Sequence, residues 1–158
     1  MLEDETLVYA VHYLHRGVAA RIAVILKRFG GTGALSGRTP RVAARRLAAL
    51  YADLDHAHGF YEGNSRTLRE FTRSLADAAG FTLDWIGTGV GAAERNQLYI
   101  ARDAAVLERA FPGLTEQRAM ETDNRAEYEA WFRLERLRGM LGERTLEAIL
   151  RERLSRPN

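Results

Sequence analysis

A twelve-residue stretch in the middle of the chain, from His58 to Arg69, gathers side chains of the types that handle phosphates. It reads His-Gly-Phe-Tyr-Glu-Gly-Asn-Ser-Arg-Thr-Leu-Arg and leads directly into a helical pattern. Gly63 and Asn64 tolerate the backbone angles that point successive N–H groups at one spot. The start of a helix adds free N–H donors and a positive partial charge. The stretch therefore predicts an anion site at a helix N-terminus.

The arginines after this loop are spaced to face that site. A helix is expected over residues 65–79, and at about 100° per residue it places Leu68 and Phe71 on one side. Arg66 and Arg69 lie on another side and project from the first turns. Two guanidinium groups and several backbone N–H groups therefore converge where a polyphosphate could lie.

Glu62 and His58 add the two remaining groups that a transfer reaction needs. A lone carboxylate beside phosphates is the usual way in which Mg²⁺ is shared between protein and nucleotide. An imidazole titrates near neutral pH and can serve as the base. Taken singly, these features also fit a capping histidine, a solvated acid, a plain turn and a solvated helix face. Together they indicate a nucleotidyl- or phosphoryl-transfer site.

The composition sets limits on the class of protein. The 158 residues, 46% hydrophobic and 28% charged, suffice for one domain with a sizeable core. The absence of cysteine excludes disulfides, thiolate nucleophiles and Cys-type zinc sites. No window approaches the roughly 18 apolar residues of a membrane helix, and the acidic N-terminus lacks a signal-peptide pattern. We therefore expect a cytoplasmic protein without membrane contact. A net charge of +2 predicts no direct binding to nucleic acid.

Helical periodicity dominates the chain and predicts a mainly α fold. Thr39 and Pro40 provide an N-cap and a proline at the first helical position. The predicted helices cover residues 16–29, 40–56, 65–79, 94–110, 122–139 and 143–154. Core positions are expected for the large side chains of the C-terminal half, namely Trp85, Tyr128, Trp131, Phe132 and Leu134. Tyr99 fits either the core or the border of a nucleotide site.

The stretch from His58 to Arg69 resembles the signature of the Fic family, H-x-F-x-(D/E)-G-N-(G/K)-R-x-x-R. Every specified position matches except Ser65, where the family has glycine, or lysine in its Doc branch. Gly59 also replaces the usual proline. A serine at position 65 costs about 1 kcal/mol or more if its backbone is left-handed and almost nothing if it is helical.

The resemblance is close over residues 39–85 and continues as expected helices over 94–154. It implies one Fic-like domain over residues 1–158, folded as a Fic-type helical bundle. Residues 5–13 are rich in Thr, Val and Tyr and are the candidate for a short N-terminal β-hairpin flap. In the family, the backbone of a target protein docks against such a flap as an added strand.

The activity implied by the resemblance is adenylyl transfer (AMPylation), in which AMP passes from ATP to a Tyr, Thr or Ser hydroxyl of a target protein. His58 would take the proton of that hydroxyl, and Glu62 would hold Mg²⁺ on the phosphates. Phe60 would anchor the loop in the core. The phosphates would be bound by residues at the start of the helix, namely Gly63, Asn64, Ser65, Arg66 and Arg69.

The resemblance also bears on regulation and partners. Fic proteins are often inhibited by a helix bearing (S/T)-x-x-x-E-(G/N), whose glutamate pairs with the second motif arginine, here Arg69. No Ser or Thr of this chain is followed four residues later by Glu. Members of this kind are commonly held by a small antitoxin, which implies the toxin half of a toxin–antitoxin pair. The targets suggested for such members are DNA gyrase and topoisomerase IV.

Other functions stay open from the residues alone. Two helices joined by a link, the second rich in arginine, fit a helix-turn-helix DNA-binding module. However, the seven residues between His56 and Asn64 exceed its usual three- to four-residue turn. A non-catalytic Fic-like interaction domain is a further alternative. Among enzymes, transfer of another nucleotide or of a phosphoryl group, as in the Doc branch, is the alternative, although Glu62 and Gly63 favour AMP.

Overall fold

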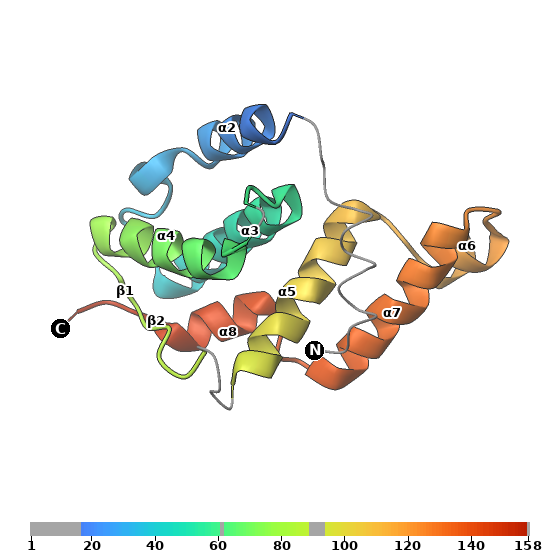
Figure 1. Ribbon diagram of the computed structural model, residues 1–158. Helices are drawn as coiled ribbons and strands as arrows, with labels where there is room; N and C mark the ends of the chain where they lie inside the picture. Colours follow the sequence, from blue (N-terminus) through green and yellow to red (C-terminus); the bar gives the residue numbers. More distant parts are fainter. Residues whose placement is uncertain (1–16, 61, 89–93, 158) are drawn as a thin grey trace.

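A computed structural model describes residues 17–60, 62–88 and 94–157. It confirms the mainly α fold class, with helices packed around a long central one (Figure 1). The candidate flap, residues 5–13, lies outside the described residues. The elements in chain order are α2 (Val18–Phe29), η1 (Gly31–Ala34), α3 (Pro40–Ala57), α4 (Asn64–Ala78), β1 (Thr82–Leu83), α5 (Arg95–Ala110), α6 (Glu116–Glu121), α7 (Arg125–Leu141), α8 (Leu146–Arg153) and β2 (Leu154–Ser155).

The central helix α3 begins where the sequence predicts. The Thr39 hydroxyl accepts a hydrogen bond from the Val42 N–H at 3.4 Å, and Pro40 occupies the first helical position. Along its length α3 packs against α2, α4, α5 and α8. Its last residue is Ala57, so His58 follows directly after the helix, at the edge of the core.

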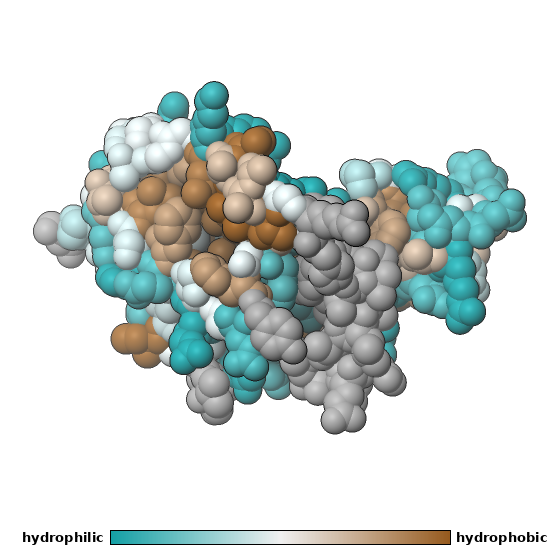
Figure 2. Space-filling view, turned by 45° about the horizontal axis from the view of Figure 1, so that its top comes forward, coloured by the Kyte–Doolittle hydropathy of each residue, from teal (hydrophilic) through white to brown (hydrophobic). Residues whose placement is uncertain are grey.

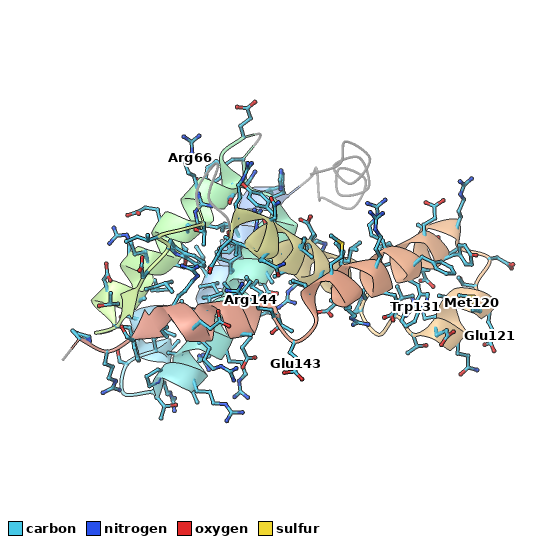
Figure 3. The ribbon with its side chains drawn as sticks, turned by 90° about the horizontal axis from the view of Figure 1, so that it is seen from below. Arg66, Met120, Glu121, Trp131, Glu143 and Arg144 are labelled. Carbon is cyan, nitrogen blue, oxygen red and sulfur yellow. The ribbon has the colours of Figure 1, made fainter. Side chains whose placement is uncertain are left out.

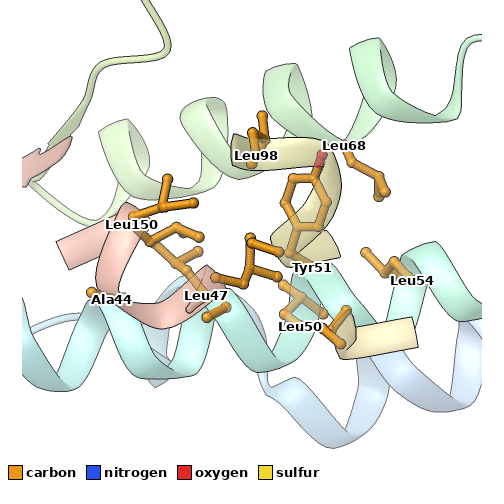
Figure 4. Close-up of a cluster of buried hydrophobic side chains, with 14 of the residues drawn as sticks. Ala44, Leu47, Leu50, Tyr51, Leu54, Leu68, Leu98 and Leu150 are labelled. Atoms are coloured by element: carbon orange, nitrogen blue, oxygen red, sulfur yellow. The ribbon is translucent and has the colours of Figure 1, made fainter. Parts of the chain in front are cut away.

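The core forms around the middle of α3. Tyr51 and Leu47 are fully buried, and Leu98 of α5 and Leu150 of α8 close over them (Figure 4). Each fully buried leucine contributes roughly 1.5–3 kcal/mol relative to an exposed one. This packing fixes α3, α5 and α8 relative to each other, and α3 leads into the loop that was predicted to form the site.

A two-stranded antiparallel sheet links the middle of the chain to its C-terminal end. Thr82 pairs with Ser155, and Leu83 pairs with Leu154 (Figure 1). This pairing was not predicted from the sequence, and the last helix ends at Arg153 rather than at the expected residue 154. The strands have two residues each and are far apart in sequence, so no local pattern marks them.

Helices α6 and α7 form an arm that projects from the body of the molecule (Figure 1). The expected burial of Tyr128 and Phe132 is wrong, because these residues are 45% and 50% exposed. Their rings meet edge to face, with centroids 4.9 Å apart. Leu134 is buried as expected, while Trp131 and Trp85 are half-buried. The outer turns of α7 have too few neighbours to cover both of its faces.

The surface is apolar in one region. Hydrophobic side chains gather over the part of the molecule that holds α2, α3 and α4 (Figure 2). Val24 and Leu26 of α2 are exposed, while Ile25 is buried in the core. Within the described residues, no helix combines the length and apolar character that crossing a membrane requires.

Candidate functional site

The loop between α3 and α4 brings the predicted base to the end of α3. His58 is the C-cap, and its N–H donates to the carbonyls of Leu54 and Asp55 at 3.2 and 3.1 Å. Its φ of 48° and ψ of 62° are left-handed, and it is the only described non-glycine residue with a positive φ. This conformation usually belongs to glycine at a helix end and costs about 1 kcal/mol in other residues. Such strain persists where the surroundings hold it, often at functional sites.

The side chain of Asn64 holds this loop in place through three contacts. Its Oδ1 accepts from the Phe60 N–H at 3.0 Å, and its Nδ2 donates to the Phe60 carbonyl at 2.5 Å. The same Nδ2 lies 3.1 Å from Nε2 of His58. Because the Phe60 N–H fixes which end of the amide is oxygen, this pattern assigns Nε2 as the acceptor, so the Nε2 lone pair of the neutral imidazole is directed at the Asn64 amide. Asn64 therefore orients His58 and closes the loop.

The N-terminus of α4 has the properties of an anion site. Gly63 is the N-cap, with a φ of 81° that only glycine adopts without strain. Its carbonyl accepts the first helical hydrogen bond, from the Thr67 N–H at 2.9 Å. No side chain of the described residues caps this end, and the N–H groups of Asn64, Ser65 and Arg66 have no acceptor within the helix. The helix dipole adds positive potential at the same place.

Two arginines stand beside these amides. Among the described residues, neither Arg66 nor Arg69 forms an ion pair, whereas Arg73 pairs with Glu70 at 2.5 Å and Asp77 at 2.7 Å. Arg66 projects from the start of α4 (Figure 3), and its Nη2 lies 3.9 Å from where a Cβ on residue 63 would be. Two guanidinium groups with no ion-pair partner in the described part of the chain therefore flank a helix end of positive potential.

Ser65 causes no backbone strain, because it lies within α4 and has no positive φ. Its hydroxyl accepts a hydrogen bond from Nη1 of Arg69 at 3.2 Å. Tyr99 of α5 lies near enough to the same hydroxyl to be influenced by it, which places Tyr99 at the border of this candidate site. Partial burial acts to raise the pKa of Tyr99, but the Ser65 hydroxyl and the guanidinium groups of Arg95 and Arg102 outweigh it and lower that pKa.

Glu62 is exposed at the turn before α4, next to the uncapped start of that helix. Within the described parts of the chain, no cluster of three or more His, Asp or Glu side chains could hold a metal ion. This donor set fits an ion that takes most of its ligands from substrate phosphates and water, as Mg²⁺ usually does.

The loop differs from the sequence expectation at Phe60. It was expected to anchor the loop in the core, but it is 53% exposed. The anchor is instead its backbone, which the Asn64 amide holds at both N–H and carbonyl. Helix α2 covers the same loop, since a Cβ at Gly59 would lie only 2.8 Å from Cδ1 of Ile22. The glycine thus allows α2 to approach closely.

A buried ion pair behind the loop was not found from the sequence. Asp55 accepts from Nε and Nη2 of Arg102 at 2.9 and 2.8 Å, and both side chains are more than nine-tenths buried. The guanidinium lies over the rings of Tyr51 and Tyr99 at 5.7 and 4.9 Å. The pair ties α5 to the last turn of α3, one turn before His58. The sequence offered one signal for this pair, because Asp55 is a carboxylate among the apolar residues on one side of α3.

An open groove of about 780 Å³ runs along the exposed side of α4. Its walls combine cationic and aromatic groups, chiefly Arg66, Arg69, Phe71 and Trp85. His58, Glu62 and Asn64 do not line it. The groove therefore starts at the two arginines and leads away from the imidazole. A polyphosphate bound at the start of α4 would lie between the imidazole and the groove.

Comparison with known proteins gives one informative match. A 51-residue segment is 41% identical to the protein adenylyltransferase VbhT of Bartonella schoenbuchensis. The match covers 32% of this chain and 11% of that protein. The chain thus resembles a small part of a protein adenylyltransferase. No family model and no solved structure matches.

Proposed function

We propose that this protein is a Fic-type protein adenylyltransferase that moves AMP from ATP to a hydroxyl of a target protein. The observation that carries the proposal is the start of α4, where uncapped amides stand beside Arg66 and Arg69, neither paired with a described carboxylate. A triphosphate supplies the charge that this site lacks. The Fic signature over residues 58–69 and the partial similarity to a protein adenylyltransferase support the same reaction.

In this reaction His58 acts as the general base. The Tyr, Thr or Ser oxygen of the target bonds to the α-phosphorus of ATP while the bond to the β-phosphate oxygen breaks. The proton of the target hydroxyl passes to Nε2 of His58, and pyrophosphate leaves. The contact with Asn64 holds Nε2 near the start of α4, and the target hydroxyl would replace the Asn64 amide at the Nε2 lone pair before the proton moves. Asn64 thus places the base beside the phosphates.

The remaining site residues stabilise charge. The N–H groups of Asn64 and Ser65 would bind α-phosphate oxygens, and Arg66 and Arg69 would neutralise the departing pyrophosphate. Glu62 would hold Mg²⁺, which when bound neutralises part of the charge of the triphosphate.

The proposal extends to regulation. The chain has no Ser or Thr followed four residues later by Glu, and Arg69 contacts a hydroxyl and a carbonyl rather than a described carboxylate. A small antitoxin partner would supply the missing acid, which makes this protein the toxin half of the pair, acting on DNA gyrase or topoisomerase IV. Expression without the partner should arrest bacterial growth, and the His58→Ala chain should not.

The function is tested by incubating the protein with a bacterial lysate, Mg²⁺ and ATP labelled at the α- or γ-phosphate. We expect transfer of the α label to a protein and none of the γ label, because the β- and γ-phosphates leave together. His58→Ala should abolish labelling. His56→Gln is the matched control, since His56 is a buried histidine two residues earlier that contacts Arg21 at 3.2 Å, and it should retain labelling.

Other results point to other functions. Transfer of the γ label would refute AMP transfer and favour phosphoryl transfer. Absence of both labels, with salt-dependent binding to duplex DNA, would favour the helix-turn-helix function. Absence of labelling and of DNA binding would leave a non-catalytic interaction domain.

A further inference from the structure

The hydroxyl of Ser65 makes a contact that glycine could not make. It accepts a hydrogen bond from Nη1 of Arg69 at 3.2 Å, one helical turn further along α4. The same Nη1 donates to the carbonyl of Thr88 at 3.2 Å, in the segment that follows β1. Arg69 is therefore held from two directions through a single nitrogen, while Nε and Nη2 form no hydrogen bond with the described residues.

The hydrogen bond between Ser65 and Arg69 lies where it can position the arginine for an anion. Ser65 lies in the first turn of α4, whose amides have no side-chain cap, so the guanidinium of Arg69 is held close to the anion site. The arginine is half-buried, and within the described residues no carboxylate compensates its charge. A long, rotamer-rich side chain loses conformational freedom on binding, and holding it beforehand reduces that loss.

We propose that Ser65 is a positioning residue for Arg69. Its hydroxyl and the Thr88 carbonyl hold the guanidinium beside the helix start, with Nε and Nη2 available to the terminal phosphates of a nucleoside triphosphate. The role toward phosphates rests on the proposed function. The serine that stands here in place of the family's glycine then increases the affinity of this chain for the nucleotide.

The first measurement concerns ATP. Ser65→Ala should raise the KM for ATP by about 2- to 12-fold, the range that one net hydrogen bond provides, with kcat changed less than about twofold. Ser65→Thr keeps a hydroxyl and should restore the KM. Ser36→Ala removes a hydroxyl that bonds the Thr32 carbonyl at 3.0 Å away from the site, and it should leave the KM unchanged. An unchanged KM in Ser65→Ala would overturn the proposal, as would a lower kcat at unchanged KM.

The second measurement needs no activity. The NMR order parameter of the Arg69 Nε–Hε group, assigned with Arg69→Lys, should fall in ligand-free Ser65→Ala protein and recover in Ser65→Thr. An unchanged order parameter would overturn the proposal even where AMP transfer occurs. If the wild-type protein labels no target, the proposed function fails together with the phosphate role of Arg69. The order parameter still decides whether Ser65 holds the arginine.

Discussion

Removal of the Asp55 carboxylate should strongly destabilise the fold. Asp55 and Arg102 form a two-pronged ion pair at 2.8 and 2.9 Å, with side chains 2% and 8% exposed. Burial acts to lower the pKa of Arg102, but the charge of Asp55 outweighs it and holds that pKa above its usual value. Asp55→Ala therefore leaves a buried cation without a partner, which costs about 3–5 kcal/mol. This is a large part of the roughly 5–15 kcal/mol that stabilises a typical domain.

Urea unfolding followed by circular dichroism measures this loss. Asp77→Ala is the matched control, since its partner Arg73 is 44% exposed and such surface pairs contribute about 0–1 kcal/mol. The double variant Asp55→Leu, Arg102→Met removes both charges and should recover most of the stability. A loss below about 1 kcal/mol in Asp55→Ala, or a double variant as unstable as the single one, would refute the account of this pair.

Three further predictions concern the site and the core. Arg66→Ala should weaken ATP binding about 10- to 100-fold by calorimetry, while the ion-paired control Arg73→Ala stays within about twofold; equal effects would contradict an anion site at the helix start. Asn64→Ala removes three hydrogen bonds and should lower the free energy of unfolding by about 2–3 kcal/mol, against little change for the exposed control Asn96→Ala; similar losses would argue against the loop clamp. Burial raises the pKa of Tyr51 from 10.0 to about 12, so its contribution to stability is complete below pH 10 and is lost as the pH rises to 12. Between pH 10 and 12 the free energy of unfolding should therefore fall by about 2–3 kcal/mol less in Tyr51→Phe than in the wild-type protein. An equal fall in both proteins would contradict the raised pKa of Tyr51.

Local signals in the sequence predicted the helices well. Thr39 and Pro40 place the start of α3 correctly, and the glycine before Asn64 places the start of α4 within one residue. These signals act through neighbouring backbone groups, so the sequence carries them directly. The same holds for the position of His58 at a helix end.

Features made by tertiary contacts were not predictable in this way. The pairing of Asp55 with Arg102 needs α3 and α5 to pack, and the pairing of β1 with β2 joins segments about 70 residues apart. The exposure of Phe132 was missed because an apolar pattern shows which residues share a helix face but not whether another element covers it. The short helix α6 (Glu116–Glu121) was also missed, since six residues carry little periodicity.

The most direct test of the central claim is to locate the phosphates. Backbone amide NMR signals would be followed while ATP and Mg²⁺ are added to the His58→Ala protein, which cannot turn the nucleotide over. An anion site at the start of α4 predicts saturable shifts of the amides of Asn64, Ser65 and Arg66, all with one dissociation constant. Signals that stay unchanged at the start of α4, or that shift only in α6 and α7, would contradict it.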